Sequence, residues 1–338
     1  MQQRTDQELP DIPVVTTGPD FAYETLIAQE EYAHALLDNA TRGVPRQILK
    51  SLDRVSRRWL VKSSNAHLGD IDRIAERLAR PGAYFLSVNY EWGCTVGVHP
   101  SSDGETARLV RVLDWRTPGL GRYIITAKVD GAAGPFTSMT WPGYSGVLQA
   151  MAPGRFSAAL NQAPMRKAGG GLYPIDWMAN KIKVWKTSHE TPAHVLRSVF
   201  ENAASFAEAR RLLIETPIAA PAIYSLAGIK PDELCIIDRT ETEAFVKDGP
   251  GAAANSWQAE DWFGRDRGND NPGRSKQMLR DIVEPCAVVD NDFAWLKPPI
   301  LNERTRLAMI ADASLGTISA RSFEQLVPAT KTYHSEQP

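Results

Sequence analysis

Cysteine is scarce in this sequence, and its few copies lie far apart. Cys94, Cys235 and Cys286 are the only three in 338 residues. Their odd number and wide spacing argue against a disulfide framework or a cysteine zinc site and indicate free thiols. The N-terminus, MQQRTDQELPDIPVV, lacks the basic head and apolar run of a secretory signal, so we expect a reducing, cytoplasmic setting.

Charge excess and long apolar runs are also missing. The formal net charge is only −2, which argues against a nucleic-acid partner. No window holds the roughly 18 uninterrupted apolar residues that a membrane span needs. With 43% hydrophobic residues, the chain is nevertheless long enough to bury a large core. These features are typical of a globular protein.

Residues 21–80 show helical spacing of apolar side chains, interrupted at Gly43 and Pro45. The second predicted helix places Ile48, Leu52, Val55 and Trp59 on one face. Its other faces are basic, with Lys50, Arg54, Arg57, Arg58 and Lys62. We favour a solvated face for these charges; weak contact with a membrane or lipid surface, or with acyl chains, is the alternative.

Residues 84–161 change to a period of two, in short β-branched or aromatic runs separated by Gly and Pro, which predicts largely antiparallel strands beginning with AYFLSVNY. Two helices follow, with N-caps at Thr191 and Ser205. PAIYSLAG and DELCIIDRT are predicted strands, residues 249–273 a loop, and residues 275–282 and 303–313 two final helices. This order predicts one α+β domain in which helices cover two stacked sheets.

Cys94 stands directly after Gly93, at the start of the run CTVGV. Buried cysteines usually act as small hydrophobes, and that interpretation is favoured for Cys235 and Cys286. None of the six histidines offers a recognisable partner motif for a cysteine nucleophile. If the bond between Gly93 and Cys94 is cut, however, the freed α-amine of Cys94, with a pKa of about 7.7–8.0, lies beside its own thiol and can serve as the base. Gly93, without a Cβ, would permit close approach to its carbonyl.

Five motifs, in order, carry a resemblance to a known family. They are CTVGV, RVLDW, MTWPGYSGVLQAMAPGRFSAALNQ, TPIAAPAIYSLAG and AANSW, spread over residues 94–257. In this order they resemble the acid ceramidase and N-acylethanolamine acid amidase family of cysteine N-terminal nucleophile hydrolases, which are related to bile salt hydrolases and penicillin V acylases. The resemblance implies a four-layer αββα sandwich with a helical N-terminal segment. It also implies a precursor that cuts itself into residues 1–93, a helical fragment, and residues 94–338, a catalytic fragment.

The resemblance assigns catalytic roles to residues near Cys94. Cys94 matches the nucleophile, Asp114 would hold its α-amine, and Arg111 would favour the thiolate. Arg111 and Asp114 lie three residues apart, so an extended strand would point them to opposite sides, and we expect a turn or bulge near Leu113 to bring both to the site. Without Cys94 upstream, RVLDW would be a strand end with a surface ion pair.

An asparagine and an arginine complete the implied catalytic set. Asn255 of AANSW matches the family residue whose side-chain amide stabilises the oxyanion; the alternative is an ordinary turn asparagine. Arg274 is our choice for the family's second arginine, and Arg265 or Arg267 is the alternative counterpart.

One position departs from the family pattern. Relatives of the ceramidase type place a glutamate where this chain has Gln162, while Asn161 is retained. Glutamine keeps the hydrogen bonding but cannot be protonated. We therefore expect self-cleavage and activity nearer neutral pH.

The sequence thus predicts a self-processing hydrolase of linear amides that cleaves an N-acyl amine or N-acyl amino acid through a thioester on Cys94. Trp141, Tyr144, Asn161 and Gln162 are the predicted substrate contacts, and we expect no metal or organic cofactor. Acyl transfer through the same thioester and non-catalytic acyl-chain binding are the alternatives. The two fragments are expected to stay assembled, with the oligomeric state open.

Overall fold

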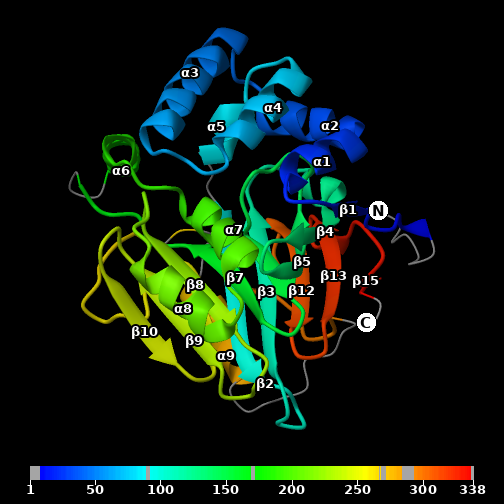
Figure 1. Cartoon of the computed structure of the whole chain (residues 1–338). Coiled ribbons are helices and arrows are strands. Elements are labelled where there is room, and N and C mark those ends of the chain that lie inside the picture. Colours follow the sequence, from blue (N-terminus) through cyan, green and yellow to red (C-terminus); the bar gives the residue numbers. More distant parts are fainter. Residues whose placement is uncertain are drawn as a thin grey trace.

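The computed structural model describes residues 8–88, 92–168, 172–265, 267, 272–283 and 293–335, without the side chains of 272, 274, 275, 282 and 283. Its centre is a pair of stacked, mainly antiparallel sheets (Figure 1). In spatial order, the first sheet contains β1 (Val14–Thr17), β4 (Ile125–Gly131), β5 (Gly134–Thr140), β6 (Gln149–Ala152), β7 (Phe156–Gln162), β8 (Ala222–Ala227), β9 (Leu234–Arg239) and β10 (Ala244–Asp248).

The second sheet contains the strand that begins at the predicted cleavage bond. Its spatial order is β11 (Gly251–Ala253), β2 (Trp92–Pro100), β3 (Ala107–Trp115), β12 (Thr305–Asp312), β13 (Thr317–Glu324) and β14 (Val327–Pro328), with β15 (Tyr333–His334) also paired to β13. Side chains of both sheets interdigitate between them and form the main core, which includes Cys94, Val96 and Leu160.

Helices cover both outer faces of this pair. Helices α7 (Pro192–Asn202) and α8 (Phe206–Glu215) cover the first sheet, and α9 (Pro272–Val283) covers the second (Figure 1). The Thr191 and Ser205 side chains accept the N-cap hydrogen bonds, as expected. The αββα prediction is therefore confirmed.

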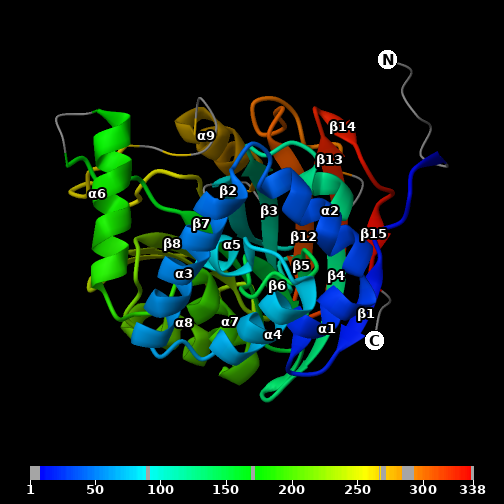
Figure 2. The same cartoon turned by 90° about the horizontal axis from the view of Figure 1, so that it is seen from above.

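The remaining helices gather at one end of the sheets (Figure 2). They are α1 (Phe21–Ala28), α2 (Glu30–Ala40), α3 (Arg46–Lys62), α4 (Leu68–Leu78) and α5 (Ala83–Val88), followed later in the chain by α6 (Tyr173–Lys186); a 3-10 turn spans Leu120–Tyr123. We call α1–α5 the helical cap. Among the described residues, no helix is both long and apolar enough to cross a membrane.

Three predicted elements are wrong at least in part. Residues 249–273, predicted as a loop, contain strand β11 at Gly251–Ala253, which pairs with β2. Residues 303–313, predicted as a helix, contain strand β12 at Thr305–Asp312. Every residue of β12 is buried because the strand lies between β3 and β13 with both faces covered. Such a strand lacks the alternation that would distinguish it from a buried helix. AYFLSVNY, predicted as a strand, contains helix α5, and the strand begins only at Trp92.

Candidate active site

Cys94 faces the space between the two sheets, close to the start of β2. Its side chain is 2% exposed, and Sγ lies 3.9 Å from the carbonyl oxygen of Leu160 on β7 of the opposite sheet. Gly93 is buried as well and pairs with Asp114 on β3. The predicted nucleophile and cleavage bond therefore lie in the core, at the end of the sheets beneath the helical cap.

Arg111 shares this inward face with Cys94. Val96 pairs with Arg111 and Cys94 with Leu113 in the antiparallel ladder, so Cys94 and Arg111 point to the same side of the sheet. Arg111 is fully buried; its Nη1 donates to Asn161 Oδ1, and its Nη2 donates to the Leu160 carbonyl at 2.9 Å. A guanidinium fork held by two acceptors has little freedom to move.

Burial of Cys94 raises the pKa of its thiol to about 12. The positive charge of Arg111 and hydrogen bonds from its guanidinium and from the backbone of Gln162 lower that pKa, but burial outweighs them. In the uncut chain, the thiol is therefore protonated at neutral pH. A free α-amine beside the thiol would supply a base and make it a stronger nucleophile.

Asp114 lies on the face of β3 opposite Arg111. The expectation that a turn or bulge in β3 near Leu113 brings both side chains to the same side is therefore wrong. The β2–β3 ladder runs without interruption from Trp92 to Pro100, and the irregularity lies on the neighbouring strand β12, between Thr305 and Leu307. Asn302 Nδ2 and Thr305 Oγ1 each donate to the Asp114 carboxylate at 2.9 Å. Burial raises the pKa of Asp114, while these two hydrogen bonds and the charge of Arg111 oppose the rise.

Asn255 contacts the predicted cleavage bond directly. Its Oδ1 accepts the backbone N–H of Cys94 at 2.7 Å, and its Nδ2 donates to the Gln162 carbonyl at 2.7 Å. Asn161 supports the same loop, because its Nδ2 donates to the Ala254 carbonyl at 3.1 Å. The buried amides of Asn255 and Asn161 thus connect β2, β7 and the segment after β11.

Asp238 holds the far side of this loop and was missed by the sequence reasoning. Its Oδ2 accepts the backbone N–H groups of Gln258 and Ala259, three and four residues after Asn255. Burial raises the pKa of Asp238 to about 6. The sequence around Asp238 gives no signal for this contact, because Gln258 and Ala259 are distant in the chain. The same holds for Asn302 and Thr305, which are distant from Asp114.

Gln162 lies beside Trp92, the residue before Gly93. Its Oε1 accepts the backbone N–H of Trp92 at 3.2 Å. The Gln162 backbone contacts both Asn255 and Cys94. Gln162 therefore holds the chain on both sides of Gly93. The position that departs from the family pattern is therefore central to the site.

Of the three candidates for the second arginine, the structure describes the side chains of Arg265 and Arg267. The side chain of Arg274 lies outside the described residues, although its backbone belongs to α9. Arg265 and Arg267 both line a small pocket that reaches Gly93 and Asp114. Arg265 pairs with Asp176 at 3.4 Å and lies over the Tyr173 ring.

A second pocket, with an empty volume of ≈ 860 Å³ measured out to solvent, opens between β7, β8 and α6. Its walls are mainly apolar and include Val88, Trp177, Val184 and Pro192. Leu160 and Asn161, which contact Cys94 and Arg111 from the opposite sheet, also line it. The apolar pocket therefore ends near the thiol.

Trp141 and Tyr144 lie away from these pockets. Trp141 is 4% exposed, and its Nε1 donates to the Leu120 carbonyl at 2.8 Å. Its ring packs edge-on against Trp115, which in turn stacks on Trp92. Among the described residues that line the two pockets, neither Trp141 nor Tyr144 is found. Trp141 belongs to the core, and the half-buried Tyr144 packs against it.

The other two cysteines do not join the site. Cys235 is buried in β9. Cys286 lies outside the described residues. No group of three or more His, Cys, Asp or Glu side chains that could hold a metal occurs in the described part of the chain.

Comparisons with known proteins confirm the resemblance. No protein-family model matches the chain. Acid ceramidase of Homo sapiens is 36% identical over 110 residues, 32% of this chain and 26% of that protein. Acid ceramidase of Macaca fascicularis is 34% identical over 186 residues, 53% of this chain and 45% of that protein. The match thus spans less than half the length of these relatives.

A solved structure shows the same fold. The Caenorhabditis elegans ortholog of N-acylethanolamine-hydrolyzing acid amidase superposes with a TM-score of 0.52 at 22% identity, covering 66% of this chain and 94% of that chain. The αββα architecture that the motifs implied is therefore shared with this amidase.

Proposed function

We propose that this relative of the acid ceramidases is a self-processing cysteine amidohydrolase that cleaves linear N-acyl amides. One observation carries the proposal: the thiol of Cys94, the guanidinium of Arg111 and the amide of Asn255 converge on a buried bond preceded by glycine. These groups are a nucleophile, a cation that favours the thiolate and a hydrogen-bond donor for an oxyanion.

Maturation would begin at the bond between Gly93 and Cys94. The Cys94 thiol gives up its proton as Sγ attacks the Gly93 carbonyl carbon and a C–S bond forms. The C–N bond breaks as the nitrogen takes up that proton to become the α-amine. Water then hydrolyses the thioester, giving a Gly93 carboxylate and the free thiol. Gly93 permits this close approach because it has no Cβ. Gln162 in place of a glutamate supports cleavage near neutral pH.

Turnover would repeat this chemistry on a substrate. The α-amine of Cys94 removes the thiol proton, Sγ attacks the substrate amide carbon, and the protonated amine returns that proton to the leaving nitrogen. Asn255 Nδ2 carries two hydrogens; one is donated to the Gln162 carbonyl, and the other would stabilise the oxyanion. Water finally releases the acid from the thioester.

The acyl half of the substrate would occupy the apolar pocket. That pocket begins at Leu160 and Asn161 and runs outward along α6, with Trp177 and Val184 in its wall. Burying a methylene group there contributes about 0.8 kcal/mol, so longer unbranched acyl chains should bind more tightly until the pocket is filled.

Denaturing mass spectrometry tests the proposal. The purified chain, held between pH 5 and 8, should resolve into two fragments, the larger starting at Cys94. N-acyl amides should then release free amine, followed by an amine-reactive dye. A chain that stays intact across this pH range would contradict self-processing.

Cys94→Ala is the matched loss-of-function variant and should be uncut and inactive. Cys235→Ala is the control, because Cys235 is also a buried thiol in a strand but lies outside the site. The control should be cut and active. Amine release by Cys94→Ala would show that the nucleophile is misassigned.

A further inference from the structure

Four arginines share one pocket with Gly93. Arg116, Arg265, Arg267 and Arg304 line it, whereas Asp114 is the one carboxylate among its described lining residues. The lining therefore carries more positive than negative side chains, which suits an anionic group.

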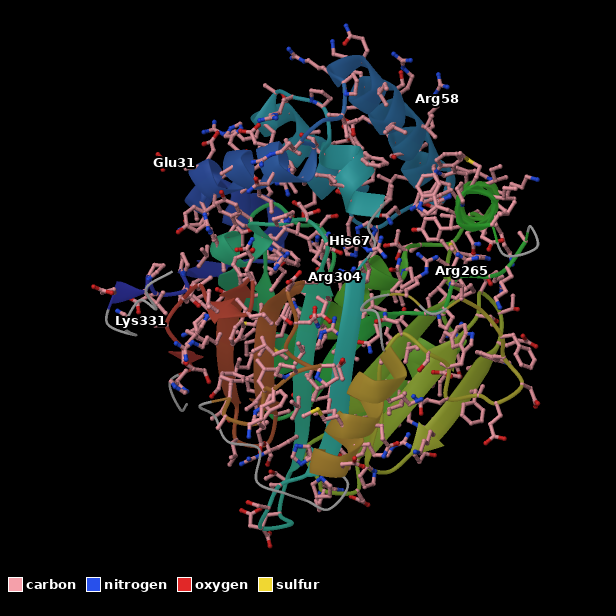
Figure 3. All side chains as sticks on the ribbon, turned by 180° about the vertical axis from the view of Figure 1, so that it is seen from behind. Glu31, Arg58, His67, Arg265, Arg304 and Lys331 are labelled. Carbon is pink, nitrogen blue, oxygen red and sulfur yellow. The ribbon has the colours of Figure 1, made fainter. Side chains whose placement is uncertain are left out.

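The four side chains come from three separate parts of the chain. Arg116 follows β3, Arg304 immediately precedes β12, and Arg265 and Arg267 belong to the loop after β11. Figure 3 shows Arg304 and Arg265 at the ends of the sheets that face the helical cap. The fold therefore brings the arginines together at the same end as the cleavage bond.

These guanidinium groups can bind an anion in addition to their other partners. Arg265 already pairs with Asp176, yet its side chain is 31% exposed; Arg116 is exposed and Arg304 half-buried. Each guanidinium has five N–H donors, and its planar fork matches the two oxygens of a carboxylate. An arginine with one partner can thus still bind a second.

We call the pocket lined by Arg116, Arg265, Arg267 and Arg304 the arginine pocket. It meets the apolar pocket near the bond between Gly93 and Cys94. Trp92, Gln162 and Arg267 line both, and Gly93, which lines the arginine pocket, is bonded to Cys94. An amide held at Cys94 would direct one half into each pocket. The apolar walls suit the acyl half, which leaves the arginines for the amine half.

We propose that the arginine pocket binds a carboxylate on the amine half of the substrate, so that N-acyl amino acids are preferred over N-acyl amines with a neutral head group. This inference rests on the proposed amidase function. It concerns the processed enzyme, in which the substrate takes the place next to Gly93.

Paired substrates that differ only in the head group test the inference. The processed enzyme should hydrolyse N-dodecanoylglycine with a kcat/KM at least about tenfold above that of N-dodecanoylethanolamine, since a charge-assisted hydrogen bond contributes about 1.5–3 kcal/mol. The ratio should shrink in 1 M NaCl, because exposed charges are screened.

Arg304→Gln and Arg116→Gln should each lower this ratio about tenfold or more, mainly by raising KM for the glycine conjugate. Arg304 is half-buried, so its replacement could also affect folding, whereas Arg116 is exposed and its replacement should leave folding intact. Arg211→Gln is the control: it breaks an exposed pair with Glu215 on α8 and should keep the ratio of the wild type.

Equal turnover of the two amides by the processed wild type would overturn the inference while leaving the amidase function standing. The arginines could instead hold only the Gly93 carboxylate that cleavage creates. Arg304→Gln and Arg116→Gln would then lose the helical fragment but keep the wild-type ratio of kcat/KM values, and this result would also overturn the inference. An uncut chain that hydrolyses neither amide would refute the proposed function itself.

Discussion

A single residue, Cys94, shows why self-cleavage would matter chemically. Burial holds the pKa of its thiol at about 12, although Arg111 lies close enough to favour the thiolate. Asn255 meanwhile accepts the N–H of Cys94, a group that would become the α-amine. Cutting one bond would therefore place a base beside the thiol, within reach of Asn255. The same residues would serve both states.

Replacing Gln162 with glutamate should make maturation depend on acid. The carboxylate could accept the Trp92 N–H as Gln162 Oε1 does, but when ionised its negative charge would raise the pKa of the Cys94 thiol further. Gln162→Glu should therefore be cut fastest below the carboxyl pKa and more slowly as pH rises, whereas the wild type should be cut near neutral pH. Gel time courses between pH 4.5 and 8 measure this.

The matched control is Gln47→Glu, which adds the same charge on the exposed surface of α3. Its pH profile of cleavage should equal that of the wild type. Identical profiles for Gln162→Glu and the wild type would contradict a role for this position in the pH dependence of maturation.

At the scale of elements, local signals in the sequence predicted most of the fold. The caps at Thr191 and Ser205, the helical spacing before residue 80 and the apolar runs of β8 and β9 are all confirmed. Each signal acts within a few residues, because caps and periodicity reflect the backbone's own hydrogen bonding.

Elements whose character depends on tertiary contacts were not predicted. β12 is buried on both faces, so its apolar residues do not alternate with polar ones as in a half-buried strand. Helix α5 is short and packed against α3 and α4, so its apolar residues show no helical period. The site divides in the same way. Cys94, Arg111 and Asn255 could be proposed from motifs, but Asp238, Asn302 and the arginine pocket depend on chain segments that meet only after folding.

Helices α4 and α7 meet at a buried polar seam that should respond to pH. His194 accepts at Nδ1 from Asn65 Nδ2 and contacts Ser145 Oγ through Nε2, each at 2.9 Å. Asn65 Oδ1 accepts the His67 N–H, which fixes the amide so that its NH₂ faces His194. A proton on Nδ1 would therefore face another donor. Figure 3 shows His67 between the cap and the sheets.

Acid should accordingly destabilise the fold. Burial, with the charge of Arg197, lowers the pKa of His194 to about 3, against 6.5 for an unperturbed histidine. The unfolded state thus binds more protons between these values, and the free energy of unfolding falls as pH drops through this range. The slope is about 1.4 kcal/mol per pH unit for one histidine. Urea unfolding at pH 7 and pH 5 measures it.

His194→Gln should be less stable than the wild type at pH 7 but lose less stability by pH 5, because Gln does not titrate. His34→Gln is the control, since His34 is about 40% exposed on α2 and lies 3.9 Å from Glu30. Parallel losses in His194→Gln and the wild type would show that His194 does not cause the loss of stability in acid.

At the scale of the whole molecule, the seam joins the two parts that cleavage would separate. Residues 8–88 supply Asp70 and Pro19, and α7 supplies Arg197, whose Nη1 lies 2.9 Å from Asp70 Oδ2. Trp59 Nε1 adds a hydrogen bond to the Thr187 carbonyl at 3.2 Å. Because Arg197 and Asp70 are 3% and 5% exposed, salt should screen their attraction little.

We therefore expect the cut fragments to co-elute in size-exclusion chromatography at pH 7, even in 1 M NaCl. Arg197→Leu should release the helical fragment, because Asp70 and Glu201 lose their buried cation at a cost of about 3–5 kcal/mol. Lys62→Gln is the control: it removes exposed hydrogen bonds to the Trp185 and Lys186 carbonyls across the same boundary and should leave the fragments together. Co-elution of the Arg197→Leu fragments would mean that apolar packing of the cap alone holds the assembly, and separation of wild-type fragments in salt would mean that exposed charges do.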